Sequence, residues 1–493
     1  MDFYSTRGEG PVSGARAIIN GIAKDGGLYV PSSFPKITPE DLADMAELSY
    51  AERAAYVMSL YLTEFSYEEL LTYTEKAYSR FEDSDPAPVV KIDEGTYMLE
   101  LWHGPTLAFK DVALTMLPYL LTAAKKKEGE NNKTLILVAT SGDTGKASLE
   151  GFKDVEGTEI AVLYPADGVS DMQRLQMTTT DGKNVHVYGI RGNFDDAQSA
   201  VKRIFASETI KNSLAEKGYD LSSANSINFG RLLPQIVYYV SSYVDLLSNE
   251  MIDDREHINY VVPCGNFGNV LAAYYAKKMG LPVKQLIVAS NENNVLTEFF
   301  SDGIYDSNRE FFKTISPSMD ILVSSNLERL LYEIGDRNSE FVKPLMERLA
   351  DGGTYSIDED MLYDKLPEFL AYYSTEAETK EVIDNFFDEY GYVLDPHTAV
   401  AVSALFKYMN EVGDNTTSNV IVSTASPFKF PQTVYEAISH NEEDDAFKAA
   451  KKLAAFSGET EPKAIKSLLS KPVLHGEIID IEEIDGVLLA VGG

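Results

Sequence analysis

The chain has 493 residues, with 43 basic and 77 acidic side chains and a formal net charge of −34 at pH 7. This charge opposes broad attraction to nucleic acids and to anionic membranes, so neither is expected as a partner. No apolar stretch approaches the roughly 18 residues of a spanning helix, no signal pattern opens the chain, and its one cysteine, Cys264, excludes an internal disulfide. We therefore expect a cytoplasmic protein with two or three domains.

Residues 1–90 are predicted to form a small N-terminal α+β domain. Glycine and proline punctuate its first part, and helical patterns follow from about residue 39 to residue 80. Acidic residues and two prolines in the stretch 82–88 discourage regular structure, so we place the domain boundary there.

From about residue 91 to residue 430, short apolar runs alternate with helical patterns, which predicts an α/β fold with open parallel sheets. Buried strands are expected at 134–140, 160–164, 185–188, 258–262, 286–288 and 420–422, and helices at 195–208, 231–247 and 269–279. Residues 304–390 are expected to form a mostly helical insertion, and residues 431–493 a C-terminal appendage of helices with a final strand-like run. Ligands of such folds gather at the carboxyl ends of the strands.

Lys110 follows a largely uncharged segment, 101–109, and precedes a helix-like run. Apolar neighbours such as Phe109 disfavour the ammonium form and lower the pKa of a lysine. A neutral lysine is a nucleophile that forms Schiff bases with carbonyl compounds. Judged alone, the same motif is also compatible with a surface lysine at the start of a helix.

Two Gly-rich turns each follow a predicted strand and open a predicted helix, so their backbone N–H groups converge on an anion. Residues 264–269 are a candidate phosphate cradle, although they lack dinucleotide spacing and also fit a plain Gly-rich turn. Residues 140–145 offer hydroxyl and amide donors to a carboxylate or phosphate. They do not form a nucleotide P-loop, because Thr140 replaces its first glycine and Ala147 replaces its magnesium-binding hydroxyl.

Two further motifs offer polar groups. Residues 225–231 combine short donors with the guanidinium of Arg231, a set suited to an oxyanion, although a helix cap with a surface arginine has the same pattern. Residues 424–430 place the hydroxyl of Thr424 at the end of a predicted strand. The six histidines show no metal-binding spacing, so no metal site is expected.

Taken together and in order, these motifs resemble those of the threonine synthases. They read H-G-P-T-x-A-F-K-D at 103–111, T-S-G-D-T-G at 140–145, N-S-I-N-x-x-R at 225–231, G-N-F-G-N at 265–269 and S-T-A-S-P-x-K-F at 423–430. The resemblance spans the chain, since residues 4–8 and 25–31 are similar to the N-terminal domain of that family.

This resemblance implies a pyridoxal-phosphate enzyme of fold type II, similar to the β subunit of tryptophan synthase. The implied activity is that of a carbon–oxygen lyase acting on phosphate. It eliminates the γ-phosphate of O-phospho-L-homoserine and adds water at the β-carbon, giving L-threonine in the last step of threonine biosynthesis. A monomer or a homodimer is expected.

The resemblance also implies roles for individual residues. Lys110 carries the cofactor as a Schiff base, Thr424 hydrogen-bonds its pyridine nitrogen, and Asp143 stands near its 3′-oxygen, where some relatives have asparagine. The cofactor-binding set is completed by Phe109, Gly265, Asn266, Phe267, Gly268 and Asn269. The substrate-binding set is Thr140, Ser141 and Thr144 toward the carboxylate, and Asn225, Ser226 and Arg231 toward the phosphate. Ser426 replaces a histidine common in the last motif, so no role is transferred to it.

Two alternatives stay open at this point. One is a different pyridoxal-phosphate enzyme of β-elimination or replacement, similar to the serine and threonine dehydratases, which the 225–231 motif and the N-terminal motifs disfavour. The other is a catalytically silent binding protein on the same fold, against which the intact Lys110 and the Gly-rich loop argue.

Overall fold

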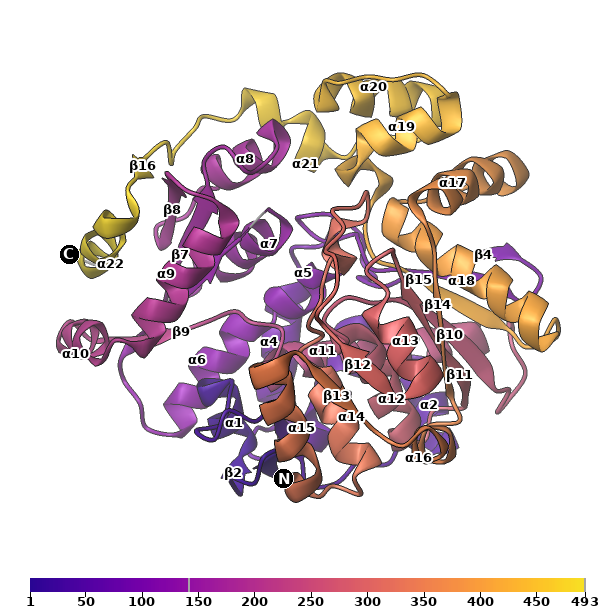
Figure 1. Ribbon diagram of the computed structural model, residues 1–493, viewed down its shortest axis with the longest axis horizontal. Helices are drawn as coiled ribbons and strands as arrows, with labels where there is room; N and C mark the ends of the chain where they lie inside the picture. The colour runs from indigo at the N-terminus through magenta and orange to yellow at the C-terminus, as the bar shows by residue number, and fades with distance from the viewer. Residues whose placement is uncertain (141, 492–493) are drawn as a thin grey trace.

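Two mostly parallel β-sheets organise the chain, and helices cover their faces (Figure 1). The computed structural model describes residues 1–140 and 142–491. The larger sheet, in the order β14-β11-β10-β15-β5-β4, consists of β4 (Val89–Asp93), β5 (Thr96–Glu100), β10 (Ile258–Pro263), β11 (Val283–Ser290), β14 (Phe369–Tyr373) and β15 (Asn419–Ser423). Within it, only the β4–β5 pair is antiparallel.

The smaller sheet is parallel throughout and has the order β16-β8-β7-β6-β9. Its strands are β6 (Lys133–Ala139), β7 (Thr158–Pro165), β8 (Val185–Ile190), β9 (Tyr219–Ser222) and β16 (Ile478–Ile479). Every residue of β7, β10 and β15 is buried, as apolar runs covered by helices on both faces require.

Helices between residues 110 and 302 connect and cover the strands. They are α5 (Lys110–Leu114), α6 (Leu117–Lys127), α7 (Asp143–Phe152), α8 (Asp171–Thr178), α9 (Phe194–Ala206), α10 (Glu208–Glu216), α11 (Phe229–Ser248), α12 (Gly268–Met279) and α13 (Val295–Asp302). Helices α5, α7 and α12 begin within three of the predicted site motifs, those at 103–111, 140–145 and 265–269. The sequence motifs therefore lie at helix starts, where backbone N–H groups are free to bind anions.

The N-terminal segment forms an antiparallel sheet in the order β2-β1-β3 and four helices. These elements are β1 (Asp2–Ser5), β2 (Val12–Ser13), α1 (Gly14–Asn20), β3 (Tyr29–Pro31), α2 (Pro39–Met45), α3 (Tyr50–Tyr61) and α4 (Tyr67–Tyr78). Helices α2, α3 and α4 start in capping boxes, in which Thr38, Ser49 and Ser66 accept from the backbone N–H three residues later. The predicted mixture of strands and helices is present in this segment.

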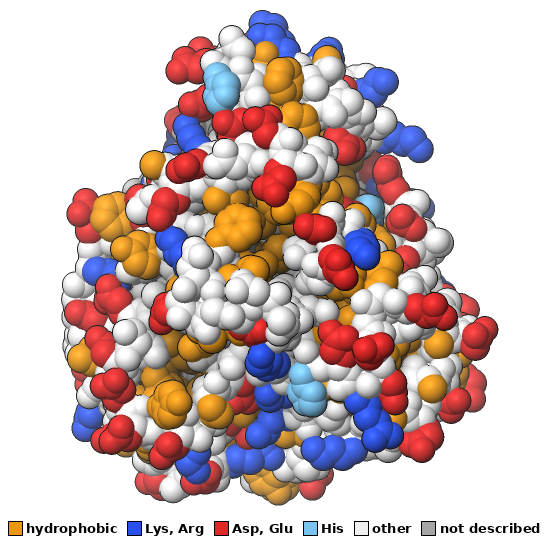
Figure 2. Space-filling model, turned by 90° about the vertical axis from the view of Figure 1, so that its right-hand side faces the viewer, with side chains coloured by type: hydrophobic (Ala, Val, Ile, Leu, Met, Phe, Trp, Pro, Cys, Tyr) orange, Lys and Arg blue, Asp and Glu red, His pale blue; other side chains and the backbone are white. Residues whose placement is uncertain are grey.

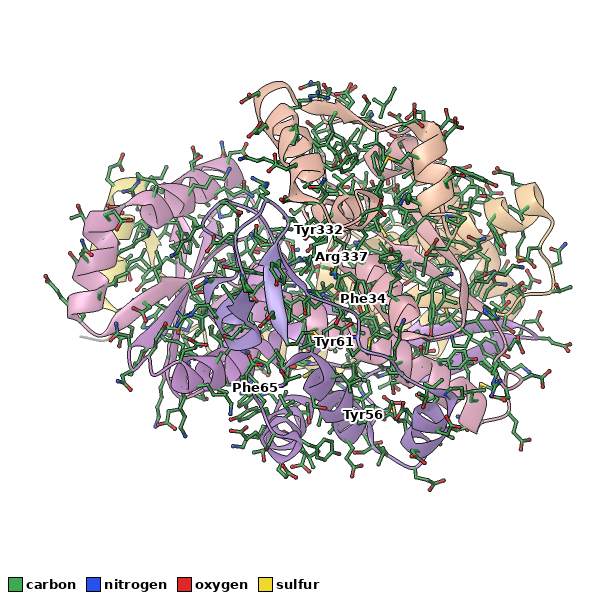
Figure 3. All side chains as sticks on the ribbon, turned by 90° about the horizontal axis from the view of Figure 1, so that it is seen from below. Phe34, Tyr56, Tyr61, Phe65, Tyr332 and Arg337 are labelled. Atoms are coloured by element: carbon green, nitrogen blue, oxygen red, sulfur yellow. The ribbon has the colours of Figure 1, made fainter. Side chains whose placement is uncertain are left out.

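Arg337 fastens the N-terminal segment to the segment 304–390. Its guanidinium donates to the backbone oxygens of Pro31 and Ser32, at 2.5 and 2.6 Å. The guanidinium carbon also lies 5.3 Å from the ring centre of Phe34 and 5.8 Å from that of Tyr332 (Figure 3). These contacts join cation–π attraction to hydrogen bonding, so the two segments pack as one body.

The six strands predicted from apolar runs are all present, and the helices predicted at 195–208, 231–247 and 269–279 correspond to α9, α11 and α12. The segment 304–390 differs from the expectation, because its strand β14 pairs with β11 and extends the larger sheet. The remaining elements of this segment are β12 (Ile304–Asp306), η1 (Pro317–Met319), α14 (Leu327–Ile334), α15 (Ser339–Gly352), β13 (Thr354–Ser356), α16 (Glu359–Lys365) and α17 (Glu376–Tyr390). It is thus partly a component of the sheet.

The C-terminal part crosses from the larger to the smaller sheet (Figure 1). Its elements are α18 (Pro396–Val412), η2 (Pro427–Lys429), α19 (Pro431–Ser439), α20 (Ala446–Ser457), α21 (Lys463–Lys466), η3 (Leu468–Ser470), η4 (Ile481–Glu483) and α22 (Ile484–Ala490), with β16 at the edge beside β8. The predicted terminal strand was wrong, because α22 buries Ile484 and Leu488 four residues apart on one helical face. Among the helices of residues 1–140 and 142–491, none combines the length and the apolar composition that a membrane-spanning helix needs.

Helices α5 and α7, which begin with Lys110 and Asp143, touch backbone to backbone at Gly151. A Cβ added to Gly151 would lie 2.1 Å from the carbonyl oxygen of Leu114. A glycine at this position therefore sets the distance between the two helices.

We predict that Gly151→Ala lowers the free energy of unfolding by about 1–3 kcal/mol, because the methyl group forces α5 and α7 apart. Urea denaturation at neutral pH measures this change. Gly486→Ala in α22 is the matched control, since an added Cβ there meets no atom within 4 Å. It should be neutral or stabilise by about 0.5–1 kcal/mol through helix propensity. Equal effects of the two substitutions would contradict the prediction.

Candidate functional site

Lys110 lies at the start of α5, beside the carboxyl end of β15. The segment before it is held against that strand by backbone hydrogen bonds, from Phe109 N to Thr424 O (2.8 Å) and from Ser426 N to Leu107 O (3.0 Å). Burial lowers the pKa of Lys110 to about 8, with Asp143 opposing the shift and Lys429 and Arg231 adding to it. The lysine predicted to be a nucleophile thus has the lowered pKa that this role needs.

Asp143 forms a buried ion pair with Lys429, a residue to which sequence analysis assigned no role. The Lys429 Nζ lies 3.1 Å from the Asp143 Oδ1 and donates to the carbonyl oxygen of Thr106 at 2.9 Å. Burial alone would raise the pKa of Asp143, but the charges of Lys429 and Lys110 outweigh it and bring the pKa to about 2. Asp143 is therefore ionised at neutral pH.

Ser426, to which sequence analysis transferred no role, shapes the turn that carries Lys429. Its Oγ accepts from the backbone N of Phe428 at 3.3 Å and caps the short helix η2. The hydroxyl is thereby used within the turn. Its place after a predicted strand could have marked Lys429 as a site residue, but nothing in the sequence predicts that it pairs with Asp143.

Residues 265–269 link β10 to α12 in a turn that only certain backbones permit. Phe267 has a φ of 63°, and a Cβ on Gly265 would lie 2.5 Å from the carbonyl oxygen of Ser318. Asn269 accepts hydrogen bonds from the hydroxyls of Tyr238 (2.5 Å) and Tyr239 (2.7 Å). Its Nδ2 is buried without a partner among the described residues, so a donor is left over at the start of α12.

Cys264, just before this turn, is buried, and its Sγ donates to the carbonyl oxygen of Val262 at 3.2 Å. Burial raises the pKa of this thiol far above its ordinary value. It therefore packs as a small apolar residue and is not a nucleophile.

The loop 140–145 is organised by Thr140. Its Oγ1 accepts from the backbone N of Gly142 (2.9 Å) and of Gly145 (3.0 Å), which curls the loop before α7. This hydroxyl shapes the loop, while Thr144 in the first turn of α7 is partly exposed. Ser141, the other predicted residue of this loop, lies outside the described residues.

Arg231 is a buried cation without a carboxylate partner in the described part of the chain. Its side chain lies in α11, where Nη1 donates to the carbonyl oxygen of Ala224 at 2.8 Å and Nε has no partner among the described residues. Burial lowers its pKa to about 10. Asn225 and Ser226 precede it in an accessible turn, exposed and half-buried respectively. A buried guanidinium with a free donor is well suited to hold an anion.

Two residues of the segment 304–390 tie the anion-binding turns together, and sequence analysis did not find them. Arg329 is fully buried and donates to the carbonyl oxygens of Tyr29 (3.0 Å) and Ile227 (2.6 Å) and to Asn326. The Nδ2 of Asn326 in turn donates to the carbonyl oxygen of Asn266 at 2.9 Å. No local pattern marks either residue, because their partners are distant in the sequence.

These features fit pyridoxal phosphate, an anionic aldehyde. The site brings together three cationic side chains, Lys110, Lys429 and Arg231, and two carboxylates, those of Asp143 and Asp111. The buried site thus carries surplus positive charge, whereas acidic side chains are spread over the face in Figure 2. Among the described residues, no group of three or more His, Cys, Asp or Glu side chains is arranged to hold a metal ion.

We predict that Asp143 and Lys429 are strongly coupled in stability. Lys429→Met and Asp143→Asn should each lower the free energy of unfolding by about 3–5 kcal/mol at pH 7, because each leaves a buried charge without its partner. The double variant should lose clearly less than the sum of the two. Chemical denaturation of all four proteins measures the coupling, and additive losses would refute it.

The pair of Asp143 and Lys429 should also make the stability of the fold depend on pH. The pKa of Asp143 lies below its ordinary value of 3.8, so its stabilisation is complete above that pH and is lost as the pH falls toward about 2. The coupling should therefore be smaller at pH 3 than at pH 7. The exposed pair of Lys211 and Glu208 is the control, and its coupling should stay within about 0.5 kcal/mol.

Comparisons with known proteins identify the family of the chain. Three family models match the chain: "Threonine synthase N terminus" at residues 2–78, "Pyridoxal-phosphate dependent enzyme" at 86–424 and "Threonine synthase, C-terminal" at 398–473. The threonine synthase of Pseudomonas aeruginosa is 38% identical over 442 residues, covering 89% of this chain and 90% of that protein. That of Saccharomyces cerevisiae is 35% identical over 465 residues, covering 89% of each.

Solved structures give the same result. The pyridoxal-phosphate-bound threonine synthase of Brucella melitensis superposes with a TM-score of 0.89 at 35% identity, covering 100% of both chains. The yeast threonine synthase also superposes with a TM-score of 0.89, at 32% identity, covering 99% of this chain and 98% of the other. The chain therefore belongs to the threonine synthase family of pyridoxal-phosphate-dependent enzymes.

Proposed function

We propose that the chain converts O-phospho-L-homoserine and water into L-threonine and inorganic phosphate, in the cytoplasm and as a monomer or homodimer. The observation that carries this proposal is Lys110, whose pKa is about 8, in a buried site with surplus positive charge. Such a site supplies both a base and the counter-charge for a doubly charged phosphate. Membership in the threonine synthase family supports the choice of substrate.

Each turn of the site receives one anionic or polar group in this proposal. The turn 265–269 and the start of α12 hold the phosphate of pyridoxal phosphate, with the free Nδ2 of Asn269 as one donor. Thr424 follows the end of β15, beside Lys110, and its hydroxyl hydrogen-bonds the pyridine nitrogen of the cofactor. Phe109 lies next to Thr424. The loop 140–145, with Thr140, Ser141 and Thr144, binds the substrate carboxylate, and Asn225, Ser226 and Arg231 bind its phosphate.

The pair of Asp143 and Lys429 takes the place of the asparagine found in some relatives. An ionised carboxylate alone would repel an anionic 3′-oxygen of the cofactor, but the pair is electrically neutral at a separation of 3.1 Å. The Lys429 ammonium has three N–H donors. Two of these donors bind Asp143 and the carbonyl oxygen of Thr106, so the third is left to donate a hydrogen bond to the 3′-oxygen of the cofactor.

When bound, pyridoxal phosphate supplies an electron-accepting ring that acidifies the hydrogens of the substrate carbons next to it. Lys110 then removes the proton at Cα and later returns one there. Arg231 holds the phosphate while the Cγ–O bond breaks and the phosphate leaves with the electron pair. Cγ gains a proton and becomes a methyl group, Cβ loses one hydrogen and receives the hydroxyl of water, and the second water proton balances the released phosphate.

We predict equal amounts of threonine and inorganic phosphate from O-phospho-L-homoserine when the purified protein is loaded with pyridoxal phosphate. Lys110→Ala should lose at least about a thousandfold in both products, because it removes the base and the cofactor attachment together. Amino-acid analysis and a phosphate assay measure the two products. Lys211→Ala, an exposed lysine, is the matched control.

Two other results would contradict the proposal. Phosphate release without threonine would indicate a different elimination. Turnover of serine or threonine to a keto acid, with O-phospho-L-homoserine unused, would assign the chain to dehydratase chemistry.

A further inference from the structure

Lys110 has a hydrogen-bond partner to which the proposed function assigns no role. Its Nζ donates to the Oγ of Ser318 at 3.2 Å, although the two residues are 208 positions apart in the chain. Ser318 lies in η1, within the segment 304–390. Among the described residues, Ser318 is the one hydrogen-bond partner of the Lys110 amine.

The backbone of Ser318 is held by a buried histidine. The N–H of Ser318 donates to the Nε2 of His397 at 3.1 Å, so this ring nitrogen carries no hydrogen and Nδ1 is the donor. Nδ1 lies 2.8 Å from the Oδ1 of Asp395, which also caps the start of α18 by accepting from backbone N–H groups. A chain of hydrogen bonds thus runs from the start of α18 through His397 to Ser318 and Lys110.

The rest of the η1 turn is also fixed. Asp320 accepts hydrogen bonds from the Nδ2 of Asn291 (2.8 Å), and from the Oγ1 (2.7 Å) and backbone N (3.0 Å) of Thr314. On the other side, Gly265 has no Cβ, which allows the carbonyl oxygen of Ser318 to approach the 265–269 turn. Ser318 therefore has little freedom to move away from Lys110, and its position depends on the anion-binding turn.

The charged groups around Lys110 come from several elements. Asp111 lies next to it on α5, Asp143 begins α7, Arg231 lies on α11 and Lys429 on η2, and all of them influence its charge. These groups set how readily the amine loses its proton. They do not fix the direction in which the Lys110 side chain points, because among the described residues none of these groups lies within hydrogen-bonding or ion-pairing distance of the Lys110 Nζ.

We propose that Ser318 is a positioning residue that holds the Lys110 amine at the site, and that His397 and Asp395 hold Ser318 in place for this task. A hydroxyl both donates and accepts, so it keeps the amine in place in its protonated and its neutral form. The effect on turnover rests on the proposed function, since Lys110 is the base of that reaction. The effect on the amine itself does not.

The first test uses the full-length chain freed of cofactor. Reductive methylation of Lys110, followed by peptide mass spectrometry over a series of pH values, should have a midpoint near pH 8 in the unchanged protein. In Ser318→Ala the ammonium loses its acceptor, so the midpoint should move down by about half to one pH unit. Ser318→Thr keeps the hydroxyl and should restore the midpoint. Ser301→Ala, an exposed serine of α13, is the matched control.

The second test uses the enzyme loaded with pyridoxal phosphate and O-phospho-L-homoserine as substrate. Ser318→Ala should lower kcat about ten- to hundredfold, with KM changed by less than about threefold, because the base is misplaced while the anion-binding groups are intact. Ser318→Thr should recover most of kcat. His397→Leu should reproduce the loss, since the N–H of Ser318 then has no acceptor.

The outcomes separate the two proposals. An unchanged labelling midpoint together with unchanged kcat in Ser318→Ala overturns the positioning role, even if the variant is less stable. A shifted midpoint in a protein that makes no threonine in any form upholds the contact and refutes the proposed function. If Ser318→Ala does not fold, Ser318→Cys carries the same expectation, because it keeps the size of the side chain with a much weaker acceptor.

Discussion

The burial of one lysine ammonium is the constraint on which the rest of the site depends. Lys110 is placed in the interior by the backbone pairing of its preceding segment with the end of β15. Burial brings its pKa to about 8, and the charge of Asp143 keeps it from falling further. An isolated buried charge is costly; the carboxylate of Asp143 stabilises the Lys110 ammonium, and Lys429 in turn stabilises the Asp143 carboxylate.

The charge of the site is opposite to that of the molecule. A surface with a net charge of −34 repels a phosphorylated amino acid at long range, but salt screens that repulsion beyond about 10 Å at 0.1 M ionic strength. Within the site, Arg231, Lys110 and Lys429 act through a less polar medium and at short distance. Capture of an anionic ligand is therefore governed by three buried side chains more than by the acidic exterior.

Much of this architecture is predictable from the sequence, and the limits have a physical cause. The turns at 140–145 and 265–269 are contiguous motifs that follow predicted apolar strands, so their place at strand ends could be predicted, and Lys110 could be singled out from the uncharged segment before it. Ser318 and Lys429 each act through a partner hundreds of residues away in the chain. Such contacts leave no local pattern in the sequence, so they could not be predicted from it. The same holds for β14, whose five residues are recognisable as a strand only through their pairing with β11.

We propose that Lys110, and no other lysine, carries the cofactor. The side chains of Lys146 and Lys429 are also buried and belong to α7 and η2, which border the site, so they are the relevant competitors. The most direct measurement is borohydride reduction of the cofactor-loaded protein, followed by digestion and mass spectrometry of the lysine-containing peptides. We predict a stable phosphopyridoxyl group on the peptide with Lys110 and none on those with Lys146 or Lys429. A modification on either of these two, or none on Lys110, would contradict it.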